Sequence, residues 1–385
     1  MEQVSTYFSF FPTLKMASPS TDAIPNAFKG LEGQPGFPAD TPFAQISNIS
    51  HQKILDGDVD EIAKVIKSGR DIGFFRVDFR DSETGKKFLA AANNMFALAE
   101  ETFNLPTETK LADSFLKHGD TLLGYKGLGA SVVDEEGTRD NNEQYWIGCG
   151  QWSLAAIYND VIKNKQAHLK EFIDLGKDIT DKFLTILASA IGLGPESPEF
   201  LPKLHSHSNN SGSHVRLLKC PPKTGGSHIS LQPHTDWGTF TVLFNALGGL
   251  QIYMPENLVG PGEQPGWRYV KPEPGMAIFN LGDAFVKWSD GELKSTIHRV
   301  VTPPGEQAKW MRYSLAYFTR PDNDVLLKPL GRKALPSDAA KEYPTFKEWA
   351  VRRATAGRSD RFQKGDWVRG QGTEPVMSAQ ARIAV

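Results

Sequence analysis

The stretch HTDWGTFTVLF, residues 234–244, places a histidine and an aspartate two residues apart directly before a run of β-branched and aromatic residues. Thr, Val, Leu and Phe at this density are typical of a β-strand packed in a core. Side chains two residues apart on a strand point to the same side. We therefore expect His234 and Asp236 to share one face, either in an ordinary polar turn or as two ligands of one metal ion.

A further histidine favours the metal site. The strand-like run STIHRVVTPP, residues 295–304, contains His298. Two imidazoles and one carboxylate on one face of an ion leave positions open, and this is the ligand set of non-haem Fe(II) sites that activate O₂. The sequence thus predicts His234, Asp236 and His298 as the metal-binding and catalytic residues.

The next strand-like run, RYSLAYF, residues 312–318, adds a candidate anion site. Arg312 and Ser314 are again two residues apart and share a face. Arginine presents a planar fork that pairs with a carboxylate through two hydrogen bonds, and a serine hydroxyl adds a donor. We interpret the pair as the site for the far carboxylate of a dicarboxylic cosubstrate. The alternative is a structural arginine paired with a surface acid.

Helical patterns dominate the first half of the chain and strand patterns the second. Apolar residues at helical spacing predict helices over 56–68, 83–103 and 166–191, with a short strand at 73–77. After Pro195, short strand-like runs alternate with Gly, Pro, Asn and Asp; they are HVRLLKC, TFTVLF, LQIYM, WRYV, MAIFN, TIHRVV and MRYSLAYF. Their even spacing indicates a sandwich or barrel of antiparallel strands. A mainly β fold with flanking helices follows from this pattern.

Four regions are predicted along the chain. They are a poorly ordered arm over 1–40, a helical and mixed region over 41–195, a β core over 196–345, and a C-terminal helix and tail over 346–385.

The composition excludes several classes of partner. Lys and Arg number 43 against 45 Asp and Glu, a net charge of −2, which offers no footprint for nucleic acid or an anionic membrane. No apolar run approaches the roughly 20 residues of a membrane span. Two cysteines, Cys149 and Cys220, make no disulfide framework, and the N-terminus lacks a secretory pattern. We expect a cytoplasmic protein acting on a small molecule, and the sequence predicts no oligomeric state.

Taken in order, several motifs resemble the family of Fe(II)- and 2-oxoglutarate-dependent dioxygenases related to isopenicillin N synthase, thymine hydroxylase and the plant flavonoid oxygenases. The motifs are GFFRV, NEQYWIG, HTDWGTFTVL, GGLQI, NLGD, STIHRV and RYSLAYF, and the resemblance runs from about Pro42 to the C-terminal helix. It implies a helical N-terminal half and a double-stranded β-helix, or jelly-roll, core. It also implies Fe(II) on His234, Asp236 and His298, with 2-oxoglutarate held by Arg312 and Ser314.

The resemblance further implies a reaction. With O₂ as the second cosubstrate, such an enzyme oxidises a small organic metabolite by hydroxylation, desaturation or ring rearrangement and releases succinate and CO₂; a role in specialised metabolism is expected. One departure concerns a tyrosine that plant members carry on the strand before the HxD motif. The corresponding run, HVRLLKCPP, has Leu217 and Leu218 where aromatic residues would be expected.

Two other functions stay open at this point. An oxidase like isopenicillin N synthase would use iron and O₂ without 2-oxoglutarate, with the same arginine and serine binding its substrate. A non-catalytic jelly-roll module would keep the fold without the metal.

Other histidines, several aromatic residues and the cysteines are weaker candidates for a site. His205, His207 and His214 lie in a Ser- and Asn-rich stretch typical of a loop rather than a metal site. The cysteines are interpreted as packed side chains. Five aromatic residues are interpreted chiefly as core residues, with a substrate pocket as the alternative; they are Tyr125, Tyr145, Trp146, Phe285 and Trp288.

Overall fold

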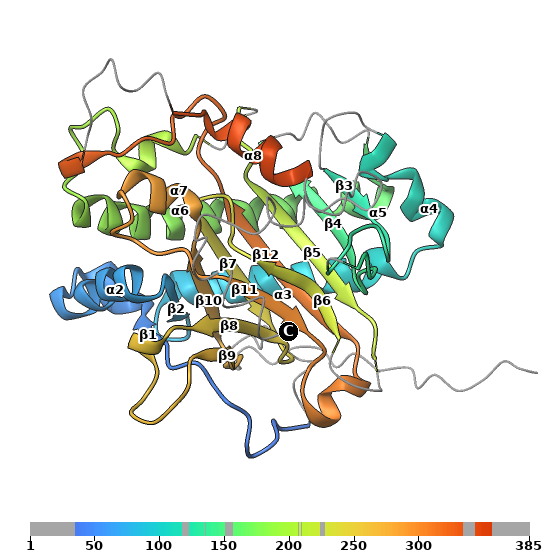
Figure 1. Ribbon diagram of the computed structural model, residues 1–385. Helices are drawn as coiled ribbons and strands as arrows, with labels where there is room; N and C mark the ends of the chain where they lie inside the picture. Colours follow the sequence, from blue (N-terminus) through green and yellow to red (C-terminus); the bar gives the residue numbers. More distant parts are fainter. Residues whose placement is uncertain are drawn as a thin grey trace, which may run out of the picture.

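A computed structural model describes residues 35–117, 123–134, 136–150, 157–206, 208, 210–223, 228–333 and 343–355. Within these ranges two β-sheets face each other, and helices cover the outer side of the larger sheet (Figure 1). The helices are α1 His51–Asp56, α2 Val59–Asp71, α3 Glu83–Phe103, α4 Thr107–Ala112, α5 Asp160–Asn164, α6 Gln166–Ala190, α7 Asp283–Trp288 and α8 Phe346–Thr355.

The larger sheet contains eight strands in the order β1-β2-β10-β7-β12-β5-β4-β3. Its strands are β1 Ser47–Ser50, β2 Phe74–Asp78, β3 Gly124–Lys126, β4 Glu143–Gly148, β5 His214–Cys220, β7 Phe240–Asn245, β10 Met276–Leu281 and β12 Arg312–Thr319. Among the described strand pairs of this sheet, only β1 and β2 run parallel. Strands from both sides of the predicted boundary at 195 therefore belong to one sheet.

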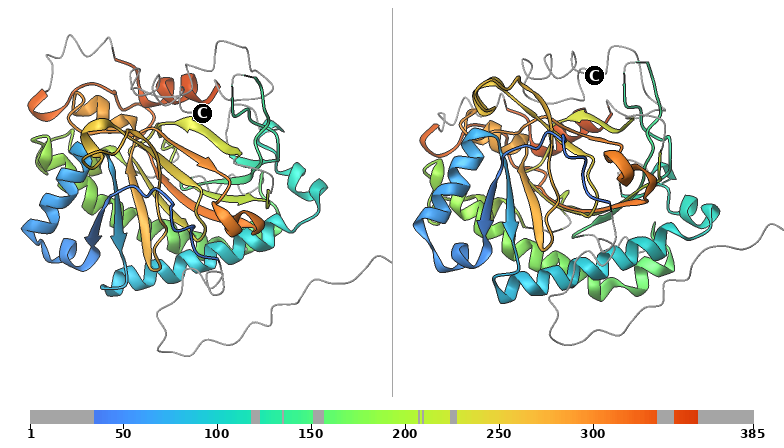
Figure 2. Two further views of the ribbon diagram at one scale, coloured as in Figure 1. Left: turned by 60° about the horizontal axis from the view of Figure 1, so that its bottom comes forward. Right: turned by 90° about the horizontal axis from the view of Figure 1, so that it is seen from below.

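The alternation of side chains along β12 separates the core from the site. Leu315 and Tyr317 face the helices, where the Tyr317 ring packs so closely on α6 that a Cβ on Gly176 would lie 3.1 Å from it. Phe88 of α3 and Phe172 of α6 stack on each other, with ring centroids 5.0 Å apart, and join the same core. Figure 2 shows α3 and α6 running along this side of the sheet. Arg312 and Ser314 lie on the opposite face of β12, away from the helices and the apolar core.

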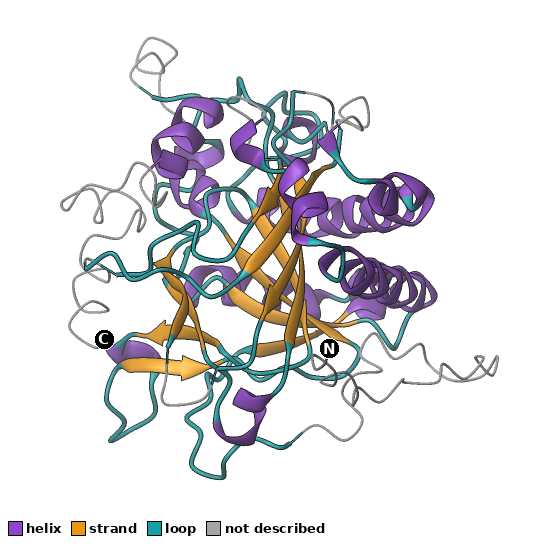
Figure 3. Ribbon diagram, turned by 90° about the vertical axis from the view of Figure 1, so that its right-hand side faces the viewer, coloured by secondary structure: helices purple, strands orange, loops and turns teal. Residues whose placement is uncertain are grey.

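The smaller sheet has the order β6-β11-β8-β9 and supplies the two histidines. Its strands are β6 Ile229–His234, β8 Leu250–Met254, β9 Gly266–Tyr269 and β11 His298–Val301. His298 is the register partner of His234 on the antiparallel neighbour. Figure 3 shows the two long helices nearly end-on, on one side of the strands.

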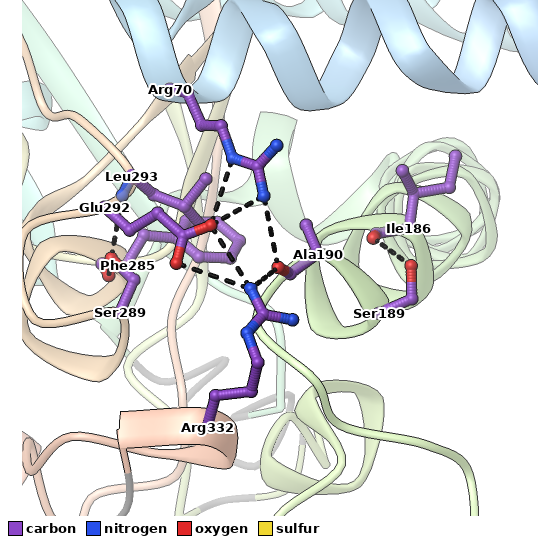
Figure 4. Close-up of polar contacts among 9 residues, drawn as sticks. All are labelled: Arg70, Ile186, Ser189, Ala190, Phe285, Ser289, Glu292, Leu293 and Arg332. Atoms are coloured by element: carbon purple, nitrogen blue, oxygen red, sulfur yellow. Dashed lines mark hydrogen bonds and ion pairs between the residues drawn. The ribbon is translucent and has the colours of Figure 1, made fainter.

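A cluster of charged side chains ties the helical layer to the end of α6. The Arg70 and Glu292 side chains form an ion pair of 2.7 Å, and Arg332 lies 3.4 Å from the same carboxylate. Both arginines also donate to the carbonyl oxygen of Ala190, the last residue of α6 (Figure 4). Cations at a helix C-terminus satisfy carbonyls that have no partner within the helix. The cluster therefore fixes α6 against α2 and the segment after α7.

Most predicted elements agree with the observed ones to within a few residues. The predicted helix 83–103 coincides with α3, and the predicted runs HVRLLKC and LQIYM coincide with β5 and β8. Strand β6 was missed. Residues 1–34 of the predicted arm lie outside the described residues. Within the described ranges, no helix has the length and apolarity needed to span a membrane.

Candidate metal and cosubstrate site

The structure brings His234, Asp236 and His298 together at one end of the smaller sheet. Asp236 Oδ1 lies 3.6 Å from Nε2 of His234 and 3.8 Å from Nε2 of His298. One ligand atom from each of the three residues lies within 4.8 Å of the others. His234 and Asp236 face each other as expected, but strand alternation does not explain it, because β6 ends at His234 and Asp236 lies in the following turn. The turn itself brings the carboxylate back towards the ring.

Each histidine is held in the tautomer that a metal requires. Nδ1 of His234 lies 2.8 Å from the carbonyl oxygen of Gln232, and Nδ1 of His298 lies 3.1 Å from that of Thr296. A carbonyl accepts a hydrogen bond only from N–H, so Nδ1 carries the proton and Nε2 keeps its lone pair. Burial, followed by the neighbouring charge of His234, lowers the pKa of His298 to about 4, which keeps this ring neutral near pH 7.

Asp236 is oriented by two side chains of the larger sheet. Its Oδ2 accepts hydrogen bonds from the Thr241 hydroxyl and from Nδ2 of Asn280, the latter at 2.7 Å. Thr241 and Asn280 are register partners on β7 and β10, so both point to the same side. Burial alone would raise the pKa of Asp236, whereas a proton on either facing histidine and the hydrogen bond from the Thr241 hydroxyl lower it below its ordinary value. Oδ1 is therefore left as an ionised ligand atom.

Backbone contacts and a buried ion pair hold the turn that carries Asp236. The amide of Asp283 donates to the carbonyl oxygen of Asp236 at 2.8 Å. A Cβ on Gly282 would lie 2.3 Å from the Gly238 carbonyl oxygen, so only glycine allows this approach. Arg353 of α8 forms a fully buried ion pair with Asp283 and donates to the carbonyl oxygen of Thr235 at 2.9 Å.

Arg312 is held in place by its neighbours through some of its five N–H groups. Its Nε donates to the Gly248 carbonyl oxygen at 2.8 Å and its Nη1 to Ser314 Oγ at 2.7 Å. Arg312 and Ser314 are buried, with 3% and 2% of their surface exposed. The register partner of Arg312 on β5 is Cys220, whose thiol also contacts the guanidinium. The position beside Arg312 is therefore a cysteine, rather than Leu217 or Leu218, and β5 offers no tyrosine.

A cavity of about 150 Å³ lies beside two of the candidate metal ligands. Its lining includes His234 and Asp236, together with Trp146, Arg216 and Arg320, but neither Arg312 nor Ser314. Of the aromatic candidates, Trp146 lines this cavity. The others are core residues, namely Tyr125, Tyr145, Phe285 and Trp288.

The remaining histidines and cysteines have structural surroundings. His205 is buried and lies 2.6 Å from the Leu201 carbonyl oxygen and 2.8 Å from Thr239 Oγ1. His214 is stacked between two aromatic rings, and His207 lies outside the described residues. Both cysteines, Cys149 and Cys220, are buried and form no disulfide.

Sequence reasoning missed five residues that contact the candidate ligands or line the cavity. They are Thr241, Asn280, Arg216, Arg320 and Arg353. The two-residue period of β12 leads from Arg312 directly to Arg320 and could have indicated it. Thr241, Asn280 and Arg216 depend on pairings between strands, and Arg353 depends on the packing of α8, which no local pattern reveals.

Known proteins share this architecture and its motifs. The family model of the 2OG-Fe(II) oxygenase superfamily matches residues 211–321, a range that includes the three candidate metal ligands, Arg312 and Ser314. A 2-oxoglutarate-dependent dioxygenase of Aspergillus fumigatus is 28% identical over 76% of this chain and 80% of its own. The 2-oxoglutarate-dependent dioxygenase iboH of Amanita muscaria is 30% identical over 49% of this chain and 88% of its own. The crystal structure of a full-length Neurospora crassa protein in complex with alpha-KG superimposes with a TM-score of 0.64 at 22% identity, over 83% of this chain and 98% of that one.

The chain therefore belongs to the 2OG-Fe(II) oxygenase superfamily, and it is an enzyme of the 2-oxoglutarate-dependent dioxygenase class. The shared fold is a mainly β structure with flanking helices, as predicted.

Proposed function

We propose that His234, Asp236 and His298 hold Fe(II), and that Arg312 and Ser314 bind the distal carboxylate of 2-oxoglutarate. The observation that carries this assignment is the convergence of two Nε2 lone pairs and Asp236 Oδ1 within 4.8 Å. The donor set fits a ferrous ion, because two neutral imidazoles and a carboxylate are the ligands of such sites. The buried guanidinium of Arg312 fits a carboxylate, because charge-assisted pairs are strong where water is excluded.

The bound ion and 2-oxoglutarate would supply an oxidant from O₂ that attacks a C–H bond, while 2-oxoglutarate becomes succinate and CO₂. The chain's own residues do the positioning. Thr241 and Asn280 hold the carboxylate ligand, and the two backbone carbonyls hold the imidazoles. The cavity beside His234 would orient one carbon of the substrate towards the site and exclude water. Substrate pose decides between hydroxylation, desaturation and rearrangement.

We propose a small organic metabolite of specialised metabolism as the substrate and the cytoplasm as the location. The similarity to fungal 2-oxoglutarate-dependent dioxygenases and the size of the cavity, about 150 Å³, support a small substrate.

The test is a turnover assay with the full chain. Fe(II) and 2-oxoglutarate are added anaerobically, a metabolite library is introduced, and O₂ then starts the reaction. We expect succinate release that a substrate stimulates in proportion to product. Product without succinate would contradict the assignment of Arg312 and Ser314 and favour an oxidase that uses no 2-oxoglutarate.

A further inference from the structure

Two arginines lie at the cavity end of the sheet face that carries Arg312. Arg320 follows Arg312 at the same parity along β12, directly after the strand. Arg216 is the register partner of Ala316, on the same face of β5. Both line the cavity beside His234 and Asp236. Nε of Arg216 and Nε of Arg320 are covered from solvent and have no hydrogen-bond partner among the described residues.

Arg216 is held rigidly by its neighbours. Its guanidinium carbon lies 3.7 Å from the ring centroid of Trp146 and 4.3 Å from that of Phe318, so aromatic rings cover the planar group. His214 stacks between the same two rings, and its Nε2 accepts from Nη2 of Arg216 at 3.2 Å. His214 keeps its proton on Nδ1, which donates to the Gly212 carbonyl oxygen. The remaining N–H groups of Arg216 are left for an acceptor in the plane of the guanidinium.

Arg320 is also buried beside an aromatic ring. It is 8% exposed, and its guanidinium carbon lies 5.2 Å from the ring centroid of Trp237. Its backbone amide donates to Ser213 Oγ at 2.9 Å, which anchors the end of β12. Asp236 is the carboxylate whose charge acts on both arginines.

Among the described residues that line the cavity, positive charges outnumber negative ones. Lys126 is paired with Asp140 and Arg353 with Asp283, so these groups are neutralised. Among the described residues, Asp236 is the one carboxylate whose charge acts on Arg216 and Arg320, and a ferrous ion would bind that carboxylate and add two positive charges. Bound 2-oxoglutarate carries two carboxylates. One would neutralise the charge of Arg312 and the other would bind the ion, so neither would neutralise Arg216 or Arg320. Burial, followed by the neighbouring charge of Arg320, lowers the pKa of Arg216 to about 9, although the charge of Asp236 partly opposes the shift.

Much of the remaining wall is apolar. It includes Phe115, Val132, Val133, Leu231 and Trp237. An apolar pocket with a few convergent polar groups selects a ligand that carries one matching group on a hydrophobic body. From this we propose that the substrate is a small carboxylate with an apolar body, whose carboxylate is bound by Arg216 and Arg320. The inference rests on the proposed function, because it takes the cavity beside the triad as the substrate pocket.

The test compares acids with their carboxamides. Benzoate, phenylacetate and 3-phenylpropanoate, each beside its amide, are titrated calorimetrically into the full chain loaded anaerobically with Fe(II) and saturating 2-oxoglutarate. Hydrogen bonds to a charged partner are worth enough for about a 10- to 100-fold preference. We expect at least one acid to bind more tightly than its amide by this factor. Equal affinities for all three pairs would overturn the inference.

Substitutions test which arginines bind the carboxylate. Arg216→Met and Arg320→Met keep the unbranched apolar part of the side chain but remove the guanidinium, and each should abolish the preference. Arg299→Met is the matched control, because Arg299 is also stacked on a tryptophan, at 4.2 Å from Trp267, but does not line the cavity. It should retain the preference. A preference that survives both cavity substitutions would overturn the inference even if the wild type prefers acids.

One spectroscopic readout separates the two proposals. Chelation of Fe(II) by 2-oxoglutarate gives a visible charge-transfer band that does not depend on the substrate cavity. If the band forms but no acid is preferred, the carboxylate inference fails alone. If the band never forms, the proposed function itself fails.

Discussion

Arginines occupy both ends of one sheet face, and the two ends are built differently. At one end Arg312 donates to Gly248 and Ser314 and contacts Cys220, so its guanidinium is fixed before a ligand arrives. At the other end Arg216 and Arg320 keep Nε atoms without a partner among the described residues and face a cavity. Two of the proposed metal ligands, His234 and Asp236, line the same cavity. The hydrogen bonds of Arg312 hold its guanidinium in place before a ligand binds. A ligand at the cavity end would instead supply the negative charge that the described lining residues lack.

The difference separates residues that hold the fold from residues that await a ligand. An arginine whose hydrogen bonds are satisfied within the chain stabilises the folded state, and its loss leaves an unpaired partner. A buried arginine without a partner costs stability and persists where function requires it. Substitution of an arginine paired within the chain should therefore lower stability. Substitution of a buried arginine without an acidic partner should weaken ligand binding with little loss of stability.

The largest effect is expected at Arg353, the cavity arginine that is paired. Arg353→Met leaves the carboxylate of Asp283, which is fully buried, without its cation. Breaking a buried pair from one side costs about 3–5 kcal/mol. Urea unfolding should show a loss of this size. A loss below about 1 kcal/mol would show that the ion pair does not hold the turn behind Asp236.

Substitution of Arg312 should impair the cosubstrate without affecting the metal. Arg312→Met removes the charged donor for the distal carboxylate, and we expect the Kd of 2-oxoglutarate to rise by about 100-fold. Fe(II) affinity should stay unchanged, because Arg312 is not a ligand. Titration of the anaerobic Fe(II) protein with 2-oxoglutarate measures this Kd, and a separate anaerobic Fe(II) titration measures the metal affinity. An unchanged Kd for 2-oxoglutarate would place its distal carboxylate elsewhere.

A smaller loss is expected for the side chains that orient Asp236. Thr241→Val keeps the shape but removes a hydrogen bond to Oδ2. Loss of such a supporting bond typically weakens metal binding by about 10- to 100-fold. Competition with a coloured chelator measures the affinity, and Thr241→Ser, which keeps the hydroxyl, is the control. Equal weakening in both variants would attribute the effect to packing.

The smallest effect on stability is expected at Arg216. Arg216→Met removes one of two buried like charges but also the hydrogen bond to His214, and these effects oppose each other. The free energy of unfolding should therefore change by no more than about 1 kcal/mol. Urea unfolding, run beside Arg353→Met, checks this. A loss of more than about 2 kcal/mol would make Arg216 a structural residue and remove the contrast between the two ends.

Local patterns predicted the parts of the site that lie on one segment. The alternation along RYSLAYF placed Arg312 and Ser314 on one face, because β12 is a regular strand. The same argument does not explain why His234 and Asp236 face each other, because the strand ends between them. Strand β6 itself was missed because ISLQPH contains a proline and few β-branched residues.

Other features depend on pairing across the sheet. Thr241 and Asn280 meet at Asp236 only because β7 and β10 pair in one particular register. Cys220 stands opposite Arg312 for the same reason on β5 and β12. Such contacts join residues far apart in sequence, and no single segment encodes them. The resemblance to a family supplied the ligand set, but the cavity with its two arginines required the structure.

The most direct test of the metal centre is an anaerobic Fe(II) titration of the full chain with 2-oxoglutarate present. We expect one equivalent of iron to bind with the visible chelation band, and His298→Ala and Asp236→Ala to lose both. His168→Ala, on α6 behind the sheet, should behave as the wild type. Unchanged stoichiometry and band in the His298 and Asp236 variants would contradict the assignment of His234, Asp236 and His298 as the iron ligands.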